Sequence, residues 1–255
     1  MKTFNLISFK KMVLPVPFIN YAVQEGSATE VFEKDTIPTL EGDLEITFIG
    51  HATLMFRYKN KIIHVDPVTA EADYTTMPKA DMVLLTHHHY DHLDMSAIRP
   101  ITKDDTQFVL TELCVMDAKD LKNTHVMKNG DKTVVDGLHI EAIPAYNIKH
   151  MRSPGHPFHP KGEGNGYIVT FGDKRVYIAA DTENTAEMKA LKNIDIAFLP
   201  MNLPYTMTPE MVADATKSFR PKILYPYHTG ETDTSEIIAL LKNEKNIEIR
   251  IRRMK

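Results

Sequence analysis

Four of the twelve histidines in this chain lie within six consecutive residues, 87–92, together with one aspartate. The segment reads His-His-His-Tyr-Asp-His and contains the pattern His-x-His-x-Asp-His. Neutral imidazole nitrogens and a carboxylate oxygen suit zinc or a similar divalent ion, and a short loop can direct alternate side chains into one space. A polar surface turn would have a similar composition, but this segment directly follows the run 82–86, which reads as a buried strand. The spacing therefore predicts a metal-binding loop at the end of a strand.

Two further predicted strands also end in a candidate ligand. Asp181 follows the run 175–180, and His228 follows the run 222–227. Alone, Asp181 before Thr182 would be read as a helix N-cap, and His228 as a hydrogen-bonded histidine at a strand end. Sites in layered α/β folds gather at the carboxyl ends of strands. Beside the histidine-rich loop, both side chains therefore become candidate metal ligands.

Strand and helix patterns follow one another along the chain from residue 44 onward. Apolar runs predict strands at 44–49, 51–58, 61–66, 82–86, 107–111, 132–135, 138–143, 166–171, 175–180, 194–199 and 222–227. Helices are expected at 186–191, 209–219 and 236–243, the second with Thr208 as N-cap and Pro209 at its first position. Two successive sets of strands and helices predict an α/β fold in which two sheets pack together with helices outside.

The composition is that of an ordinary globular protein. Apolar residues make up 43% of the 255 residues and charged residues 25%, which is enough for a sizeable core. The formal net charge of −4, without a long basic run, argues against a dedicated nucleic-acid-binding surface. Because Cys114 is the only cysteine, an intrachain disulfide and a cysteine-rich structural zinc site are excluded. Any metal must be held by His and Asp, a donor set more typical of catalytic sites.

The first 42 residues have no clear pattern. The apolar stretch 12–19 follows Lys10 and Lys11, as in a signal peptide, but it is short and contains two prolines. We therefore predict an N-terminal extension at 1–42, which is a degenerate signal segment or a packed or mobile extension, and one main domain at 43–255. The expected location is cytoplasmic, or periplasmic or exported if the segment acts as a signal. No stretch approaches the roughly 20 apolar residues of a membrane span.

These motifs resemble those of the metallo-β-lactamase superfamily. The segments that carry the resemblance are 49–54, 64–67, 86–94, 144–147, 158–162, 180–182 and 225–228. More narrowly, the pattern is similar to that of ascorbate-6-phosphate lactonase and of phospholipase D-type members. The resemblance implies a four-layer αββα sandwich for the hydrolase domain at 43–255. It also implies one or two bound divalent ions, with zinc expected first and manganese second.

Carried over by position, the resemblance gives a role to each matching side chain. The first metal would be held by His87, His89 and one further histidine, and the second by Asp91, His92 and His228, with Asp181 bridging the two. Asp66 matches a buried aspartate that supports the metal loop, although a turn carboxylate would have the same sequence context. His88 occupies the variable position and is expected outside the metal coordination.

The third motif departs from the superfamily pattern. After the segment 144–146, where many members have a histidine, this chain has Asn147. Similar hydrolases with an Ala-Tyr-Asn segment carry a His-Pro a little later, which matches His159 here, so His159 is the predicted remaining ligand. His150 and His156 are the weaker alternatives. Without any of them, one metal site would be weak or completed by water.

The assignments predict a metal-dependent hydrolase. Two ions roughly 3.5–4 Å apart can share a hydroxide, because metal binding lowers the pKa of water toward ~7. The hydroxide would attack a lactone, ester or phosphodiester of a small or medium-sized substrate, and Asp91 would transfer a proton. Basic side chains in the loop 147–166 either attract an anionic group or are simply solvated. His51 either points into the site or packs in the core.

Two other functions fit parts of the pattern. A nuclease of the same superfamily would need a basic groove or an additional domain, and 255 residues with a net charge of −4 offer neither. A metal-holding binding or sensor protein without turnover would use the same ligands as an enzyme. Metal analysis combined with hydrolysis assays separates these possibilities. We expect a small-molecule substrate and no nucleic-acid partner.

Overall fold

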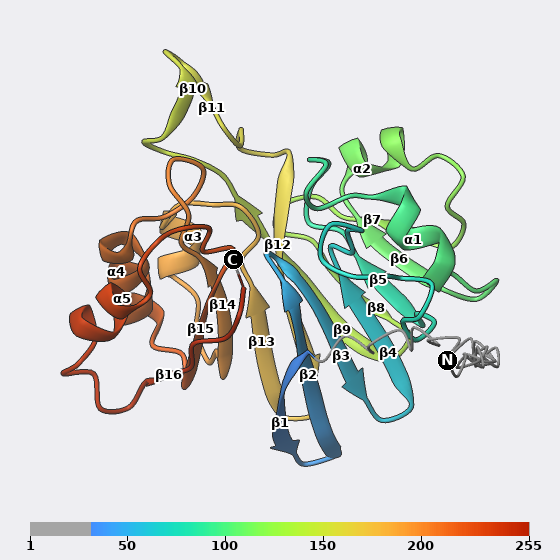
Figure 1. Cartoon of the computed structure of the whole chain (residues 1–255), viewed down its shortest axis with the longest axis horizontal. Coiled ribbons are helices and arrows are strands. Elements are labelled where there is room, and N and C mark those ends of the chain that lie inside the picture. The colour runs from blue at the N-terminus through green and yellow to red at the C-terminus, as the bar shows by residue number, and fades with distance from the viewer. Residues whose placement is uncertain (1–31, 255) are drawn as a thin grey trace, which may run out of the picture. The chain divides into compact units, whose positions relative to one another are not determined.

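The apolar runs of the sequence form two seven-stranded sheets in the computed structural model, which describes residues 32–254 (Figure 1). In spatial order, the first sheet contains β1 (Glu33–Thr39), β2 (Gly42–Gly50), β3 (Thr53–Tyr58), β4 (Lys61–Val65), β5 (Met82–Leu84), β6 (Gln107–Leu110) and β7 (Thr124–Val126). The second contains β16 (Glu248–Ile249), β15 (Ile223–Tyr227), β14 (Ile196–Pro200), β13 (Lys174–Ile178), β12 (Gly164–Phe171), β9 (Leu138–Ala145) and β8 (Lys132–Val135). A separate small hairpin, β10 (Met151–Ser153) and β11 (His156–Pro157), interrupts the connection from β9 to β12.

Alternation along the strands divides the apolar side chains into three layers of core. In β3, Phe56 faces the second sheet, whereas Met55 belongs to the cluster beneath the helices on the outer face. In β14, Phe198 faces the first sheet and Leu199 faces the helices on the other side. Within residues 32–254, five helices cover the outer faces (Figure 1): α1 (Met95–Ile101) and α2 (Glu112–Asp117) on the first sheet, and α3 (Ala186–Lys189), α4 (Pro209–Phe219) and α5 (Ser235–Leu240) on the second. This is the predicted αββα arrangement.

Local signals in the sequence explain several boundaries. Thr208 caps α4 by accepting a hydrogen bond from the Met211 backbone N–H, and Pro209 occupies the first turn, as predicted. The hairpin between β3 and β4 turns at Lys59, which has a φ of 53°, and the hairpin between β12 and β13 turns at Gly172. In the part of the chain that the structure describes, no helix is long and apolar enough to cross a membrane.

The first sheet begins earlier in the chain than the predicted domain boundary at residue 43. Strand β1 pairs antiparallel with β2 along its whole length, from Glu33 opposite Phe48 to Thr39 opposite Gly42. The segment 33–39 was assigned to the extension because only one of its side chains, Ile37, is buried, so its apolar pattern is weak. Residues 1–31 of the predicted extension lie outside the described residues.

The topology brings the candidate ligands to one edge of the two sheets. Strands β4 and β5 run parallel, as do β13, β14 and β15, so their carboxyl ends lie at common edges. The histidine-rich loop follows β5, Asp181 follows β13 and His228 directly follows β15. The backbone N–H of His228 donates to the carbonyl of His51 (2.9 Å), which links the second sheet to the end of β2 in the first.

Candidate metal centre

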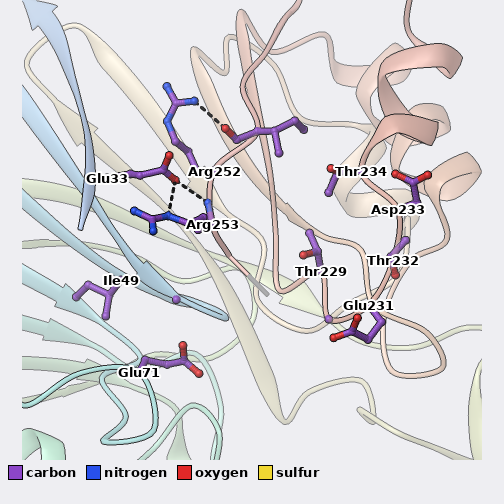
Figure 2. A pocket seen from close by; sticks show the side chains of 13 residues that line it. Glu33, Ile49, Glu71, Thr229, Glu231, Thr232, Asp233, Thr234, Arg252 and Arg253 are labelled. Atoms are coloured by element: carbon purple, nitrogen blue, oxygen red, sulfur yellow. Dashed lines mark hydrogen bonds and ion pairs between the residues drawn. The ribbon is translucent and has the colours of Figure 1, made fainter. Parts of the chain in front are cut away.

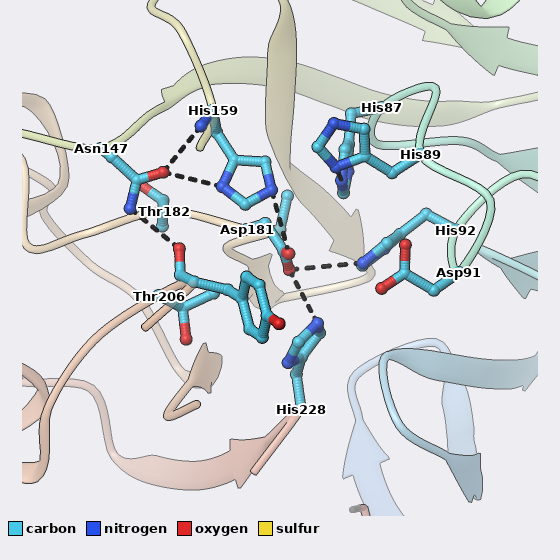
Figure 3. A network of polar contacts seen from close by, with 12 residues as sticks. His87, His89, Asp91, His92, Asn147, His159, Asp181, Thr182, Thr206 and His228 are labelled. Carbon is cyan, nitrogen blue, oxygen red and sulfur yellow. Dashed lines mark hydrogen bonds and ion pairs between the residues drawn. The ribbon is translucent and has the colours of Figure 1, made fainter. Parts of the chain in front are cut away.

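Imidazoles from three separate loops converge on the carboxylate of Asp181 (Figure 3). The Nε2 atoms of His92 and His228 lie 3.4 and 3.3 Å from Asp181 Oδ1, and His159 Nε2 lies 3.2 Å from Oδ2. All four side chains are buried. Asp181 is therefore the centre of the arrangement.

The potential ligand atoms divide into overlapping groups on either side of Asp181. Within each group the atoms lie within 4.8 Å of one another, and the groups are His87, His89 and His159; His51, Asp91, His92 and His228; and His87, His92 and Asp181. All seven residues predicted as metal ligands thus occur in one connected cluster. His88 lies next to His89 but belongs to none of these groups.

Hydrogen bonds that Asp66 accepts orient the histidine-rich loop. One carboxylate oxygen accepts from the Thr86 backbone N–H (2.8 Å), and the other accepts from the Thr86 hydroxyl (2.6 Å). The second oxygen also lies 2.8 Å from His92 Nδ1. Since an ionised carboxylate only accepts, His92 carries a proton on Nδ1. When the imidazole is neutral, its Nε2 lone pair therefore points at Asp181.

Asn147, in place of the histidine of the third motif, holds His159. The Asn147 side-chain oxygen accepts from the His159 backbone N–H and faces His159 Nδ1, both at 2.8 Å. This contact places the proton of neutral His159 on Nδ1, and the bare Nε2 then faces Asp181. Of the two alternatives, His150 contacts Glu183 and the Thr206 carbonyl, and His156 is exposed on β11. Neither belongs to the cluster.

The facing groups explain why a divalent cation suits this space. Nε2 of His92, Nε2 of His228 and Oδ1 of Asp181 are buried, yet none forms a hydrogen bond of acceptable geometry in the described part of the chain. Buried acceptors without donors are costly, and lone pairs directed at a carboxylate repel it. A divalent ion between these atoms would satisfy them, and the His and Asp donors are those that zinc and manganese accept.

His51, which the sequence left undecided, lies in the site. Its ring packs against His228 with centroids 3.8 Å apart, and its Nε2 is 3.5 Å from Asp91 Oδ2. The Asp91 side chain is 33% exposed, more than the other carboxylate of the cluster, Asp181, at 4%. Asp91 is thus the carboxylate of the cluster that solvent and a substrate can reach.

The charges of the cluster perturb its titrating groups. Burial alone would raise the pKa of Asp181, but the facing His228 and His92 hold it well below its usual range. Burial lowers the pKa of His87 well below its usual value and that of His89 to about 4. Burial also opposes protonation of His92, but Asp181 and Asp66 outweigh it and raise the pKa of His92 well above its usual value. The two facing carboxylates thus favour positive charge at this position, which a bound metal would supply.

Backbone strain also concentrates at the site. Among the described residues other than glycine, His51, Asp66, Ala180 and His228 are four of the nine with positive φ, at 47°, 43°, 61° and 47°. Such conformations cost free energy for residues with a Cβ and persist where surrounding contacts enforce them. At Ala180 the contact is a hydrogen bond from its N–H to the Tyr227 hydroxyl oxygen (2.9 Å). Each of these four residues is a candidate ligand or contacts or adjoins one.

One pocket is lined by residues of the cluster, and a larger cleft is lined in part by their chain neighbours. A narrow pocket beside the first group is lined by His87, His88, His89, His159, Glu163, Gly164 and Asp181. An open cleft of about 740 Å³ includes Gly50 and Thr229, the chain neighbours of His51 and His228 (Figure 2). Its arginines are already paired: Arg253 contacts Glu33, and Arg252 binds Asp35. The cleft also contains Glu71, Glu231 and Asp233, so it lacks the basic lining that a nucleic acid would require.

Sequence reasoning missed the residues that support the ligands. Thr86 and Glu183 are buried, and neither was singled out, because a threonine at a strand end and a glutamate after Asp-Thr are common in any context. The available signal was their position directly beside predicted ligands, since ligating histidines need hydrogen-bond partners of their own.

Comparison with known proteins places the chain in a family. The sequence profile of the Beta-lactamase superfamily domain matches residues 45–228. A UPF0173 metal-dependent hydrolase of Pelotomaculum thermopropionicum is 26% identical over 223 residues, which cover 82% of this chain and 96% of the relative.

Two solved structures are also similar. A protein of Parabacteroides distasonis, provisionally described as a metal-dependent hydrolase, is 48% identical and superimposes with a TM-score of 0.83 over 88% of this chain and 100% of the other. Igni18, a metallo hydrolase of Ignicoccus hospitalis, is 26% identical, with a TM-score of 0.67 over 82% of this chain and 94% of the other. With the matching fold and the converging ligand cluster, these similarities establish that the chain belongs to the metallo-β-lactamase superfamily.

Proposed function

We propose that this protein is a metal-dependent hydrolase that holds two divalent ions, zinc or manganese, in the cluster around Asp181. His87, His89 and His159 would bind the first ion, and Asp91, His92 and His228 the second, with Asp181 shared. The names of the relatives support hydrolysis as the reaction class. The division between two ions follows the resemblance, and it is supported by the groups of neighbouring ligand atoms, in which His51 joins the second set, and by the contacts of Asp181 with His92, His228 and His159.

One observation carries the proposal. Three buried Nε2 atoms face a single buried carboxylate at 3.2–3.4 Å. Two of these imidazoles, His92 and His159, are fixed by acceptors on their Nδ1 side. A purely structural histidine cluster would have its polar atoms paired with one another or with the backbone. Here the second nitrogens are aimed instead at a common point beside a carboxylate, as in ligand sets built for a metal.

The chain's own groups then divide the work of hydrolysis. Bound metal would lower the pKa of a water and polarise the oxygen of the bond to be cleaved. Burial alone would raise the pKa of Asp91, but the bond from His51 and the nearby His92 lower it to about 2. Asp91 is therefore ionised at neutral pH and can accept a proton from the attacking water. Its partial exposure lets it pass the proton on to the leaving group. His51, 3.5 Å from Asp91, would hold the carboxylate in place.

The surroundings favour a small or medium-sized substrate with a lactone, ester or phosphodiester bond. The open cleft lined by Gly50 and Thr229, the chain neighbours of His51 and His228, offers room for the remainder of such a molecule. The basic loop 147–166 contributes less positive charge than its sequence suggests, because Lys161 is paired with Glu187 at 2.5 Å. A long polyanion is therefore disfavoured, and cleavage of a single small electrophile is the activity that we infer.

Metal analysis followed by a panel of generic substrates tests this function. Protein stripped with a chelator and reconstituted separately with Zn²⁺ and Mn²⁺ is assayed on aryl esters, simple lactones and bis-aryl phosphates. We expect one of these classes to be cleaved only by the reconstituted protein and not by Asp181→Asn. Tight metal binding without cleavage of any class would favour the sensor alternative, and failure to bind metal would refute the proposal.

A further inference from the structure

Glu183 is a buried carboxylate at the base of the loop that carries His159. Its side chain is 0% exposed, and it lies two residues after Asp181. Its Oε2 accepts from the backbone N–H groups of Ile148 (3.0 Å) and Lys149 (2.8 Å), and its Oε1 from that of His150 (2.7 Å). Three consecutive backbone donors thus surround one charged side chain. Such a network fixes the course of the loop immediately after Asn147.

The same carboxylate also binds the Asn147 side chain. Asn147 Nδ2 donates to Glu183 Oε1 (3.2 Å) and to the backbone carbonyl of Tyr205 (2.8 Å). Both acceptors require the amide nitrogen on that side, because neither of them can donate. The Asn147 oxygen must therefore point the other way, toward the backbone N–H and Nδ1 of His159. The orientation of Asn147 follows from its partners alone.

These contacts form one continuous path from Glu183 through Asn147 to His159 and Asp181 (Figure 3 draws the last three). We propose that Glu183 is a positioning residue of the metal centre, which fixes the tautomer and direction of His159 by fixing Asn147. The proposal deepens the function above and rests on it only where His159 is taken as a metal ligand. Glu183 lies two residues after Asp181. The segment 181–183 would therefore supply the carboxylate shared by the two ions and also orient His159, the imidazole that faces this carboxylate.

Glu187, four residues after Glu183, provides a matched control for the anchoring of the loop that carries His159. Glu187 accepts from the Tyr146 hydroxyl (2.9 Å) and from Lys161 (2.5 Å), so it also ties down the two ends of the loop that carries His159. It makes these bonds at the surface and contacts neither Asn147 nor His159. A general loss of loop anchoring should follow from changing either glutamate, whereas misorientation of His159 should follow only from changing Glu183.

The test compares Glu183→Gln with Glu187→Gln. In Glu183→Gln one carboxylate oxygen becomes an NH₂ group, which faces backbone N–H donors in either orientation of the amide. We expect one of the two metal sites to weaken by about ten- to a hundredfold in a competitive chelator titration, the magnitude typical of lost support around a ligand. The other site and both sites of Glu187→Gln should stay near the wild-type affinity. Asn147→Ala should weaken the same site, and adding Glu183→Gln to it should have little further effect, because both act through His159.

A measurement on the metal-free protein keeps this proposal separate from the metal function. Long-range ¹H–¹⁵N spectra of histidine-labelled protein report which ring nitrogen of His159 carries the proton. We expect the Nδ1–H form in the wild type and in Glu187→Gln, and a mixture of tautomers in Glu183→Gln. If the tautomer changes as expected but the wild type binds no metal, the positioning role stands and the proposed function falls. An unchanged His159 in Glu183→Gln, or the same change in both variants, would overturn the positioning role.

Discussion

Replacing Asp66 with asparagine should reverse the tautomer of His92. In the wild type Asp66 Oδ1 accepts from the Thr86 backbone N–H, while Oδ2 faces the Thr86 hydroxyl and His92 Nδ1. The backbone N–H cannot change its role, so the amide oxygen of the substituted side chain should keep that bond. The new NH₂ group then faces His92 Nδ1 and favours the tautomer with the proton on Nε2. The proton would then lie on Nε2, the atom of His92 that faces Asp181 and would bind the metal.

The size of the effect follows from the hydrogen bonds involved. To bind a metal through Nε2, His92 in the variant must place its Nδ1 proton against an NH₂ group, which leaves a buried donor unsatisfied. Such a group costs about 1–3 kcal/mol. Since 1.4 kcal/mol corresponds to a factor of ten, we expect the second metal site to weaken by roughly ten- to a hundredfold. Global stability should fall as well, because two hydrogen bonds to a charged acceptor, worth about 1.5–3 kcal/mol each, are replaced by weaker bonds between neutral groups.

A matched aspartate separates these two effects. Like Asp66, Asp94 accepts three hydrogen bonds: one from the Ser96 backbone N–H, one from the Thr69 backbone N–H and one from the Thr69 hydroxyl. It caps helix α1 but contacts no histidine. Asp94→Asn should lower stability while leaving metal affinity unchanged. Chelator competition and thermal unfolding are measured on both variants. Wild-type affinity for two ions in Asp66→Asn would refute the reasoning about His92.

Three further outcomes are expected. Asp181→Ala should abolish activity and the binding of at least one ion, whereas His88→Ala should be nearly neutral; equal losses would mean that the ligands are wrongly assigned. His159→Ala should weaken one metal site and reduce turnover by at least about tenfold, whereas His156→Ala, on the exposed hairpin, should change neither. Titration of metal into both variants measures this difference. Burial of His64 lowers its pKa from 6.5 to about 4, so the unfolded chain takes up a proton first as the pH falls, and the folded state loses roughly 3 kcal/mol of stability at most between these two pH values. Urea unfolding of wild type and His64→Phe at pH 7 and pH 4 should show a smaller loss in the variant, and equal losses would count against His64 as the origin.

The layered fold was predictable because its strands are buried and strongly patterned. The runs that became β3, β5, β14 and β15 were recognised from apolar residues alone, since each packs on both faces. Strand β1 was missed because one face is solvent-exposed and its apolar pattern is weak. Helices α1 and α2, which are seven and six residues long, were missed; α1 contains Pro100, a residue that argues against a helix interior.

The candidate site was predictable as residue types but not as a network. Spacing within 87–92 indicated metal ligands, position directly after buried strands indicated Asp181 and His228, and the resemblance supplied His159. The role of Asn147 was not accessible, because the sequence shows a missing histidine but not which group would accept from His159 Nδ1. That bond joins residues twelve positions apart across a protruding hairpin, and only the folded loop brings them together.

Anomalous diffraction from crystals of the reconstituted protein tests the central claim most directly. Data collected above and below the zinc absorption edge locate bound zinc without reference to activity. We expect two anomalous peaks beside Asp181, one contacting His87, His89 and His159 and the other contacting Asp91, His92 and His228. The absence of any peak at this cluster, in protein shown to be folded and reconstituted with excess zinc, would contradict the account.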